Sequence, residues 1–350
     1  MSIGTEIVSW FEQNGRDLPW RETRDPYRIW IAEVILQQTR IETGVGYFYR
    51  FVERFPDVQH LAGADLDEVL KYWEGLGYYS RARNLHAAAQ TLVQDYGGTF
   101  PDHYQELLRL KGIGPYTARA IGSFAFANPT GVIDGNVLRV MARVLGDSRP
   151  INVPKTRQAF QAIIDQWVAD VPSRPFNFGI MDLGSVVCTP TRPGCLLCPL
   201  QDRCEARRQG LTHLLPHKEK KRKRKVRYFH FYLVEDEAGR LAIRQRPRDG
   251  LWGGLWEIPN EETPPATWQD RTDPHGGRYC GELKHAFTHF DMMIHVYRLS
   301  ADQAPSWPEI RFIDPTEIPI FAFAKAVLKI FDLTLGAPSA GSAGLAGPED

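Results

Sequence analysis

The chain has 350 residues, of which 43% are hydrophobic and 24% charged, an ordinary globular composition that is long enough for two domains. It has no apolar run near the ~20 residues that span a bilayer. Residues 1–16 lack the basic-then-apolar layout of an export signal. These features exclude a helical membrane protein and predict a cytoplasmic location.

The net charge of zero hides an uneven distribution along the chain. Residues 1–227 hold 31 Lys and Arg against 24 Asp and Glu, whereas residues 228–350 hold 11 against 18. A basic first part can approach a polyanion, and an acidic second part resists one unless a local contact compensates. The change of sign predicts a domain boundary near residue 227.

Up to residue 215 the pattern predicts helices and few strands. The run Asp65–Leu70 begins with acidic residues and continues into apolar spacing, as at a helix start. Arg81–Tyr96 and Lys155–Val168 follow the same pattern. The first part of the chain is therefore expected to be all-α.

A glycine-rich turn interrupts this helical part at residues 107–118, LLRLKGIGPYTA. We expect one helix to end near Leu110, Gly112 and Gly114 to form a tight turn, and Pro115 to open the next helix. The free amides of that helix N-terminus favour an anion. This is typical of the helix-hairpin-helix element that contacts the DNA backbone, and an ordinary helix–helix turn is the alternative.

Four of the five cysteines lie within 17 residues, with gaps of six, two and five residues: Cys188, Cys195, Cys198 and Cys204. A reducing compartment disfavours a disulfide framework. Structural zinc usually takes two close pairs of ligands, and here only one pair is close. The spacing favours one four-iron–four-sulfur cluster held by a single loop, with four buried thiols as the alternative. The fifth, Cys280, is expected to be a free core thiol.

Residues 217–227 read HKEKKRKRKVR, eight Lys or Arg in eleven residues. We expect a linker that is solvated, contacts phosphates, or does both. Beyond it, residues 228–234, 241–246 and 292–299 have strand character, and residues 323–335 predict a closing helix. The second part is therefore expected to be α+β, with a disordered Gly- and Ala-rich tail at 336–350.

Several further motifs, taken with the hairpin and the cysteine loop, resemble the MutY family of adenine DNA glycosylases within the endonuclease III superfamily. They extend over nearly all of residues 1–335: LPWR at 18–21, WIAE at 30–33, LQQT at 36–39, GLGYYS at 75–80, VIDGNV at 132–137 and DLG at 182–184. The resemblance implies a monomeric base-excision repair enzyme that removes adenine from mispairs with 8-oxoguanine or guanine in double-stranded DNA.

The resemblance also implies a multidomain fold: an all-α helix-hairpin-helix glycosylase with an iron–sulfur cluster loop, followed by an α+β Nudix-like domain. Residues 1–216 would form the catalytic region, with a six-helix barrel module at 22–134 and a cluster module from 1–21 and 135–216. DNA would lie between these two modules. Residues 217–227 would be the linker and 228–335 the Nudix-like domain.

Excision of an unoxidised purine needs a proton on the base and a carboxylate near the cationic sugar. Glu33 is the only charged residue in the apolar stretch 29–38, so its pKa should rise. The resemblance implies that Glu33 protonates N7 of adenine, that Asp134 stabilises the sugar, and that Asn136 orients the site. Asp134 could instead be only a helix N-cap.

Tyr116 stands where bifunctional relatives carry a lysine that attacks the sugar, and a phenol forms no Schiff base. Lys111 precedes the glycines and does not fill that position, so a monofunctional enzyme is expected. The resemblance implies substrate contacts from Arg16, Trp20, Arg21, Leu36, Gln38, Thr39, Leu76 and Tyr78. Of these, Gln38 and Tyr78 would wedge into the stack when the base flips out, while Gly112, Ile113 and Gly114 would hold the backbone.

In the second part, GLWGGLWEIP at 250–259 matches the characteristic turn of the Nudix-like domain. Residues 260–284 hold three glutamates but no helix of clustered glutamates for magnesium, so the domain is expected to serve recognition. By resemblance Phe287, Thr288 and His289 form the loop that finds 8-oxoguanine, with threonine in place of the usual serine. A plain strand start is the alternative.

Phe178 replaces the Gln or Glu with which the family reads the adenine edge, and its ring can only stack or pack. Either another group, such as Arg21, supplies the contact or discrimination at the target base is relaxed. Three hypotheses follow: an adenine glycosylase, another mispair glycosylase such as one for thymine, or a lesion-binding protein with idle catalytic groups.

Overall fold

The computed structural model describes residues 1–219, 224–269, 271 and 273–336. Its contacts divide the chain into two compact units. Unit 1 comprises Met1–Ala62 and Ala87–Lys221, and unit 2 comprises Gly63–His86 and Arg222–Asp350. Part of the predicted basic linker (220–223) and nearly all of the predicted disordered tail (337–350) lie outside the described residues. The predicted domain boundaries therefore stay predictions.

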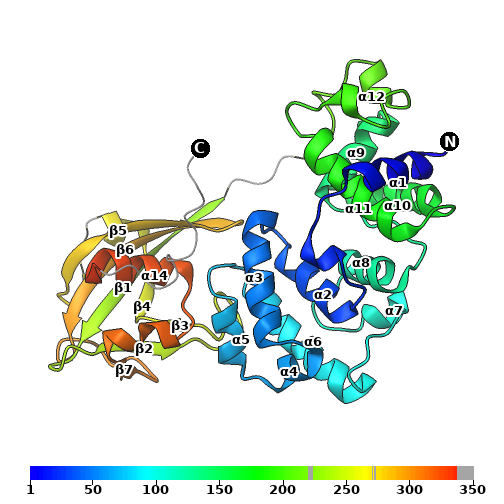
Figure 1. The fold of residues 1–350 in the computed structure, drawn as a ribbon. Helices are drawn as coiled ribbons and strands as arrows, with labels where there is room; N and C mark the ends of the chain where they lie inside the picture. Colours follow the sequence, from blue (N-terminus) through cyan, green and yellow to red (C-terminus); the bar gives the residue numbers. More distant parts are fainter. Residues whose placement is uncertain (220–223, 270, 272, 337–350) are drawn as a thin grey trace. The chain divides into compact units, whose positions relative to one another are not determined.

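Unit 1 is helical, as the sequence predicts, and residues 1–219 contain no strand (Figure 1). Its helices are α1 (Ile3–Asn14), α2 (Pro26–Ile35), α3 (Ile41–Arg54), α7 (Tyr104–Leu107), α8 (Pro115–Phe126), α9 (Gly135–Leu145), α10 (Pro154–Val168), α11 (Ser173–Asp182) and α12 (Glu205–Arg208). Helices α4 (Val58–Gly63) and α6 (Ser80–Tyr96) cross into unit 2. The predicted helices at 81–96 and 155–168 are confirmed.

The hydrophobic core of unit 1 gathers α1, α9, α10 and α11, which Figure 1 shows packed together. Ile7, Phe160 and Phe176 are fully buried there. Gly4 allows α1 to lie close to α10, since a Cβ at this position would sit 2.2 Å from the Trp167 carbonyl oxygen. This arrangement fixes the N-terminal helix against the helices that carry the later site residues.

The glycine turn differs from its prediction in one detail. Helix α7 ends at Leu107 rather than near Leu110. The Arg109 and Leu110 amides donate to carbonyls three residues earlier, so the last turn tightens into 3₁₀ geometry before Gly112 reverses the chain at φ 81°. The turn and the Pro115 helix start are as predicted.

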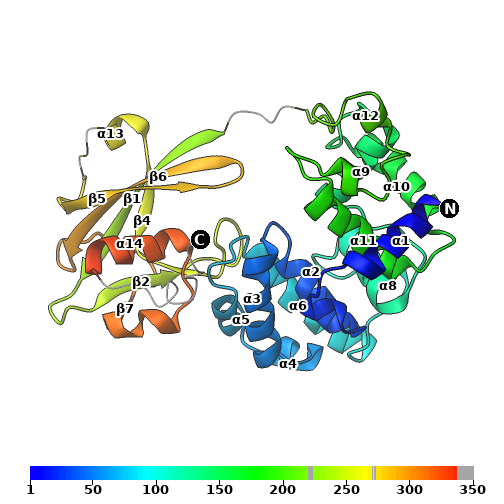
Figure 2. The ribbon, with the colours of Figure 1, turned by 45° about the horizontal axis from the view of Figure 1, so that its top comes forward.

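Unit 2 contains the mixed sheet of an α+β domain. Its strands are β1 (Lys225–Glu235), β2 (Leu241–Gln245), β3 (Trp256–Glu257), β4 (Asn260–Thr263), β5 (Arg278–Ala286), β6 (Phe290–Ser300) and β7 (Arg311–Ile313). The sheet order is β3-β2-β1-β6-β5, with β4 on β1 and β7 on β2. Figure 2 shows β1 and β6 side by side at its centre, where they pair in parallel.

The helices of unit 2 are α5 (Leu66–Tyr72), α13 (Pro265–Gln269) and α14 (Lys325–Leu335). The predicted helix at 65–70, the three predicted strands and the closing helix are confirmed, although the closing helix begins at Lys325 rather than at residue 323. One prediction is wrong: Cys280 is a free thiol, but it lies partly exposed on β5 and not in the core. Gly281 follows it at a break in the β5–β6 register, where the pleat no longer turns this position inward.

Of the helices in the described ranges, none is long and apolar enough to cross a membrane.

The packing of α1 generates a stability prediction. We expect Gly4→Ala to lower the free energy of unfolding by about 1–3 kcal/mol, because the new methyl group collides with a backbone carbonyl. Gly46→Ala is the matched control: that exposed glycine of α3 has open space around it, so alanine should be neutral or add up to about 1 kcal/mol. Urea unfolding measures both, and equal effects would contradict the packing described here.

Candidate active site

Glu33 lies on α2, whose sequence makes a helix that is buried on nearly all sides. The Asp25 carboxylate caps the helix start by accepting from the Tyr27 amide, and Pro26 fills the first position. Eight of the ten residues of α2 are buried, so the helix carries Glu33 inside with the apolar residues around it. The Glu33 residue is only 6% exposed.

Burial raises the pKa of Glu33 to about 7, as the apolar surroundings predict. The Tyr116 hydroxyl on α8 donates to Glu33 Oε2 at 2.8 Å and opposes this rise by stabilising the carboxylate. Among the smaller effects included in this value, the charge of Asp134 raises the pKa of Glu33 and the charge of Arg21 lowers it. Glu33 can therefore hold a proton near neutral pH and release it within the physiological range.

Asp134 is the N-cap of α9, and its chemical role stays a prediction. Its Oδ1 accepts from the Val137 amide at 2.7 Å, and its Oδ2 accepts from Asn136 Nδ2 at 3.0 Å. Burial raises the pKa of Asp134 despite these hydrogen bonds. These hydrogen bonds fix the orientation of the Asp134 carboxylate, so capping the helix is compatible with a chemical role for the same residue.

A hydrogen-bonded chain leads from Asp134 to the cysteine loop. Asn136 Oδ1 accepts from Arg139, whose guanidinium also donates to the Cys188 carbonyl at 2.8 Å and to the Gly184 carbonyl at 2.5 Å. One turn later on α9, buried Arg143 donates to Cys188 Sγ at 3.3 Å. Arg139 and Arg143 were not predicted, although their spacing from Asn136 along one helix face could have marked them.

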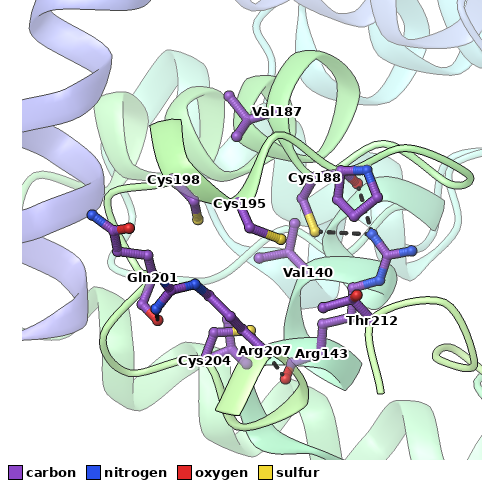
Figure 3. Close-up of a pocket in the computed structure, with 12 residues that line it drawn as sticks. Val140, Arg143, Val187, Cys188, Cys195, Cys198, Gln201, Cys204, Arg207 and Thr212 are labelled. Atoms are coloured by element: carbon purple, nitrogen blue, oxygen red, sulfur yellow. Dashed lines mark hydrogen bonds between the residues drawn. The ribbon is translucent and has the colours of Figure 1, made fainter. Parts of the chain in front are cut away.

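The four clustered cysteines line one cavity of unit 1 (Figure 3). Cys188 follows a single π-helical turn, Leu183–Val187, that extends α11. Cys195 begins a 3₁₀ turn that ends at Leu197, and Cys204 precedes α12. Figure 3 shows the sulfur atoms of Cys188, Cys195 and Cys204 turned toward the same space, with Arg143 beside Cys188.

The donor chemistry of this cavity fits a thiolate-bound centre. The pKa of the Cys198 thiol is raised to about 12, mainly by burial and in smaller part by the charges of Cys188, Cys204 and Cys195. Four thiolates this close need a cation to offset their repulsion. Within the ranges that the structure describes, no group of His, Cys, Asp or Glu side chains is arranged to hold a single metal ion. The thiols thus share a cavity without the compact geometry of a mononuclear site.

The hairpin between α7 and α8 presents its backbone to the outside. Gly114 is the N-cap of α8 with φ −91° and ψ −179°, and a Cβ added there would meet nothing within 4 Å. Neither conformation nor internal packing thus demands glycine at this position. Open space beside free helix N-terminal amides suits the approach of a phosphate. Ile113 between the glycines is buried and anchors the turn.

Comparison with known proteins connects these features. A family model described as "HhH-GPD superfamily base excision DNA repair protein" matches residues 31–166, and a "NUDIX domain" model matches residues 230–333. The mouse protein named adenine DNA glycosylase is 34% identical over 397 residues, which cover 93% of this chain and 76% of that protein. This chain belongs to the adenine DNA glycosylase family.

Two other matches bear on the adenine DNA glycosylase family assignment. The Buchnera aphidicola adenine DNA glycosylase is 31% identical over 293 residues, covering 82% of this chain and 83% of its own length. The solved structure of a thermostable thymine-DNA glycosylase is 29% identical with a TM-score of 0.55, covering 59% of this chain and 95% of its own. The helical fold is thus shared with a glycosylase named for a different base.

Phe178, which is predicted to stand where the family reads the adenine edge, packs against neighbouring side chains. Its ring is 5% exposed and lies 4.3 Å from the Phe124 ring. The Arg21 guanidinium lies over it at 4.6 Å, and Arg21 also pairs with Asp182 at 2.7 Å. Burial alone would raise the pKa of Asp182, but hydrogen bonds from Arg21 and Arg16 hold it below its usual range.

The two residues predicted to wedge into DNA share an unusual backbone conformation. Gln38 and Tyr78 have positive φ values of 61° and 47°, which non-glycine residues seldom adopt and which occur at functional sites. Both side chains are exposed. Leu36, Thr39 and Leu76 beside them are partly buried, and Trp20 is buried against Phe48.

Phe287, Thr288 and His289 form the tip of the β5–β6 hairpin, with Thr288 and His289 exposed. Within unit 2 the Tyr78 and Thr288 hydroxyls lie 2.5 Å apart. The structure thus brings together Glu33, Tyr116, Asp134 and Asn136 in unit 1, and the GLGYYS loop and the hairpin tip in unit 2. The roles of all these residues stay predictions.

The pKa of Glu33 generates a prediction about stability. The folded state holds this proton up to about pH 7, whereas the unfolded chain releases it near 4.5, so burial of Glu33 costs stability increasingly as the pH rises from 4.5 to 7. Glu33→Gln should therefore be more stable than the wild type at pH 8 by up to about 3 kcal/mol, and should differ little at pH 4.5. Urea unfolding at the two pH values measures this.

Glu53→Gln, on an exposed face of α3, is the control and should show no such pH-dependent difference. A stability gain of Glu33→Gln that is the same at both pH values would contradict the raised pKa.

Proposed function

We propose that this chain is a monofunctional adenine DNA glycosylase that excises adenine opposite 8-oxoguanine or guanine in duplex DNA. The observation that carries this proposal is the Glu33 carboxyl, buried with a pKa of about 7 and hydrogen-bonded to Tyr116. Family membership supplies the substrate class, since the mouse and Buchnera relatives bear the name adenine DNA glycosylase.

The chemistry follows from two carboxyl groups in different surroundings. Glu33, protonated near neutral pH, donates its proton to the base and makes it a better leaving group. Asp134, oriented by the Val137 amide and Asn136, offers its negative charge to the sugar as the glycosidic bond breaks. Water then adds its hydroxyl to the sugar carbon, and the proton that this water releases restores Glu33.

The hydrogen bond from Tyr116 sets the acid strength of Glu33 together with burial. It stabilises the Glu33 carboxylate once the proton has left, so the acid is strong enough to protonate a purine while burial keeps it protonated before the reaction. Because Tyr116 offers no amine, the base departs and the strand stays intact.

Access to the base requires flipping, and two local features support it. The strained backbone at Gln38 and Tyr78 holds exposed side chains in fixed positions for insertion into the stack. The contact between the Tyr78 and Thr288 hydroxyls joins Tyr78, which would wedge into the base stack, to the β5–β6 hairpin that would contact 8-oxoguanine. The duplex backbone binds at Gly112–Gly114 through helix N-terminal amides.

We propose that Cys188, Cys195, Cys198 and Cys204 hold one four-iron–four-sulfur cluster. When bound, the cluster supplies a fixed charge and a rigid tie for the loop rather than chemistry on the base. Two arginines of α9 connect the cysteine loop to the site. Arg143 donates to the Cys188 thiol. Arg139 donates to both the Cys188 carbonyl and Asn136, and Asn136 donates to Asp134. Loss of the loop would thus disturb the Asp134 carboxylate.

A specific observation keeps thymine excision as the second candidate. The thymine-DNA glycosylase structure shares the helical fold, and Phe178 is packed against Phe124 and Arg21 instead of presenting a polar group to the base. The match of residues 230–333 to a Nudix domain favours adenine, since the thymine-DNA glycosylase covers only 59% of this chain with 95% of its own length.

A single-turnover assay tests the activity on duplexes with adenine, thymine or cytosine opposite 8-oxoguanine. We expect base release from adenine alone, with strand breaks only after hot alkali. Glu33→Gln should reduce the rate by at least about a hundredfold, the scale of general acid catalysis, and Glu53→Gln should not. Release of thymine would support the second candidate, strand nicking by the enzyme would refute the inference from Tyr116, and an active Glu33→Gln would refute the acid assignment.

A variant of the cysteine loop tests the cluster. The purified wild type should contain about four irons per chain and a visible charge-transfer band, as a single cluster of this type requires. Cys198→Ser should lose both and weaken DNA binding, while Cys280→Ser, a free cysteine of unit 2, should keep both. Zinc at one per chain, or full iron content in Cys198→Ser, would contradict this proposal.

A further inference from the structure

The GLGYYS loop, Gly75–Ser80, has a backbone conformation that needs support from other residues. Gly75, Gly77 and Tyr78 have positive φ values of 92°, 70° and 47°. A tyrosine seldom adopts this region unless surrounding groups hold it there. Tyr78 is also 46% exposed, so burial in a core does not fix its side chain. The contacts that fix the loop are therefore found around it rather than at its tip alone.

Part of the support for the GLGYYS loop is local. The Arg81 guanidinium donates to the Leu76 carbonyl at 3.2 Å and to the Gly77 carbonyl at 3.1 Å. Trp73 Nε1 donates to the Gly77 carbonyl at 3.2 Å. These hydrogen bonds close the turn, but each joins residues at most five positions apart. They therefore do not set where the loop lies against the sheet of unit 2.

The long-range support comes from one residue that shortly precedes α14. The Phe323 amide donates to Glu74 Oε1 at 2.8 Å, and the Phe323 carbonyl accepts from the Tyr79 hydroxyl at 3.2 Å. The same hydroxyl accepts from the Gly75 amide at 3.2 Å. Glu74 precedes the loop and Tyr79 lies near its end, so the two backbone polar groups of Phe323 hold both ends of the loop together. All of these residues belong to unit 2.

A lysine strengthens this attachment. Lys71 Nζ donates to Glu74 Oε2 at 2.7 Å and to the Phe321 carbonyl at 3.0 Å. The Glu74 side chain is only 11% exposed. Hydrogen bonds to a charged group are about twice as strong as neutral ones, and removal from water strengthens them further. Glu74 therefore makes a firm contact with the backbone of the segment that precedes α14.

Phe323 is itself fixed to the sheet and to α14. Its side chain is fully buried and meets the Phe331 ring of α14 edge-on at 5.1 Å. Its backbone forms a parallel bridge with Trp256 of β3, and the Trp256 amide donates to the Ala322 carbonyl at 2.9 Å. Trp256 belongs to the run GLWGGLWEIP at 250–259. This run therefore connects the sheet to the residue that holds the GLGYYS loop.

The same sheet also meets the loop at its tip. The Tyr78 hydroxyl lies 2.5 Å from the Thr288 hydroxyl on the β5–β6 hairpin. The Phe287 amide donates to the Phe290 carbonyl at 2.9 Å and closes that hairpin. A hydroxyl contact of this length is lost when either partner moves by about 1 Å. The contact at the tip therefore depends on where the two ends of the loop are held.

We propose that Tyr79 and Glu74 are positioning residues that anchor the GLGYYS loop to Phe323. The anchor aligns Tyr78 with Thr288, and it thereby sets how strongly the enzyme prefers adenine opposite 8-oxoguanine over adenine opposite guanine. This inference rests on the proposed function, in which Tyr78 enters the base stack and the β5–β6 hairpin contacts 8-oxoguanine.

The Tyr79→Phe variant of the full chain tests the proposal, because it keeps the buried ring and removes only the hydroxyl. Single-turnover rates of adenine release are measured on duplexes with 8-oxoguanine or guanine opposite adenine. We expect the ratio of the two rates to fall about tenfold, the scale of one lost hydrogen bond. Glu74→Ala should lower the ratio similarly. A general loss of folded protein would lower both rates alike, and that result would overturn the proposal.

A double variant separates the alignment of Tyr78 from other effects. Tyr78→Phe removes the contact with Thr288 directly and should lower the same ratio. Adding Tyr79→Phe to Tyr78→Phe should then cause little further loss, because the contact that the anchor aligns is already gone. Fully additive losses would contradict an action of Tyr79 through Tyr78.

Tyr232→Phe is the matched control. Tyr232 is a fully buried tyrosine of unit 2 whose hydroxyl donates to Glu261 at 2.6 Å, away from the anchor in sequence and in its partners. The variant loses a buried hydrogen bond, as Tyr79→Phe does, but it should keep the ratio of the wild type.

Hydrogen exchange of the protein without DNA tests the anchor separately from the activity. The amides of residues 75–80 should exchange at least about fivefold faster in Tyr79→Phe and Glu74→Ala than in the wild type, and should be unchanged in Tyr232→Phe. Unchanged exchange in both anchor variants would refute the anchor itself. If the wild type releases adenine from neither duplex, the proposed function is refuted and the effect on preference with it, whatever the exchange shows.

Discussion

The proposed chemistry depends on one energetically unfavourable feature: the Glu33 carboxyl group is buried away from water on helix α2. The pKa of Glu33 is raised to about 7, with removal from solvent as the largest cause and smaller effects from the rest of the site. The Tyr116 hydroxyl stabilises the charged form, and Asp134 opposes it. An acid in bulk water with an ordinary pKa would be deprotonated at neutral pH, so the reaction that we propose requires this burial.

Helix α9 joins the two chemical features of unit 1. Its N-cap is the second carboxylate, its first turn supplies Asn136, and its next two turns supply the arginines that reach Cys188. Gly184, at the π-helical turn before Cys188, lets the chain pass Asn136 closely, since an added Cβ would lie 2.7 Å from the Asn136 Cβ. The cysteine loop is thereby linked through α9 to the Asp134 carboxylate, although it does not contact that carboxylate.

Much of this was accessible from the sequence because it depends on local pattern. Apolar residues around Glu33 predict its raised pKa, and the glycine–proline turn predicts the hairpin. The cysteine spacing predicts a cluster-binding loop, and in the structure the four cysteines line one cavity. The helix end at Leu107, the partly exposed Cys280 and the strands β3, β4, β5 and β7 were not found, because short elements and register breaks are decided by pairing partners far along the chain. The contacts of Arg139 with Gly184 and Cys188 have the same origin.

Two buried histidines of unit 2 show the other limit of sequence reasoning. His230 and His295 lie 65 positions apart and meet only because β1 and β6 pair in parallel. Neither residue stands in a motif, and each alone would be taken for an ordinary strand residue. Their proximity becomes visible only once the sheet is assembled, because it depends on pairing between strands far apart in the chain.

The folded protein is expected to hold a proton on Glu33 near neutral pH, and infrared spectroscopy observes that proton directly. Difference spectra between the wild type and Glu33→Gln, recorded from pH 4 to pH 9, isolate the carbonyl stretch of the protonated Glu33 carboxyl. We expect a protonated-carboxyl band that disappears with a midpoint near pH 7. A band that is lost by pH 5, as for a solvent-exposed glutamate, would contradict it.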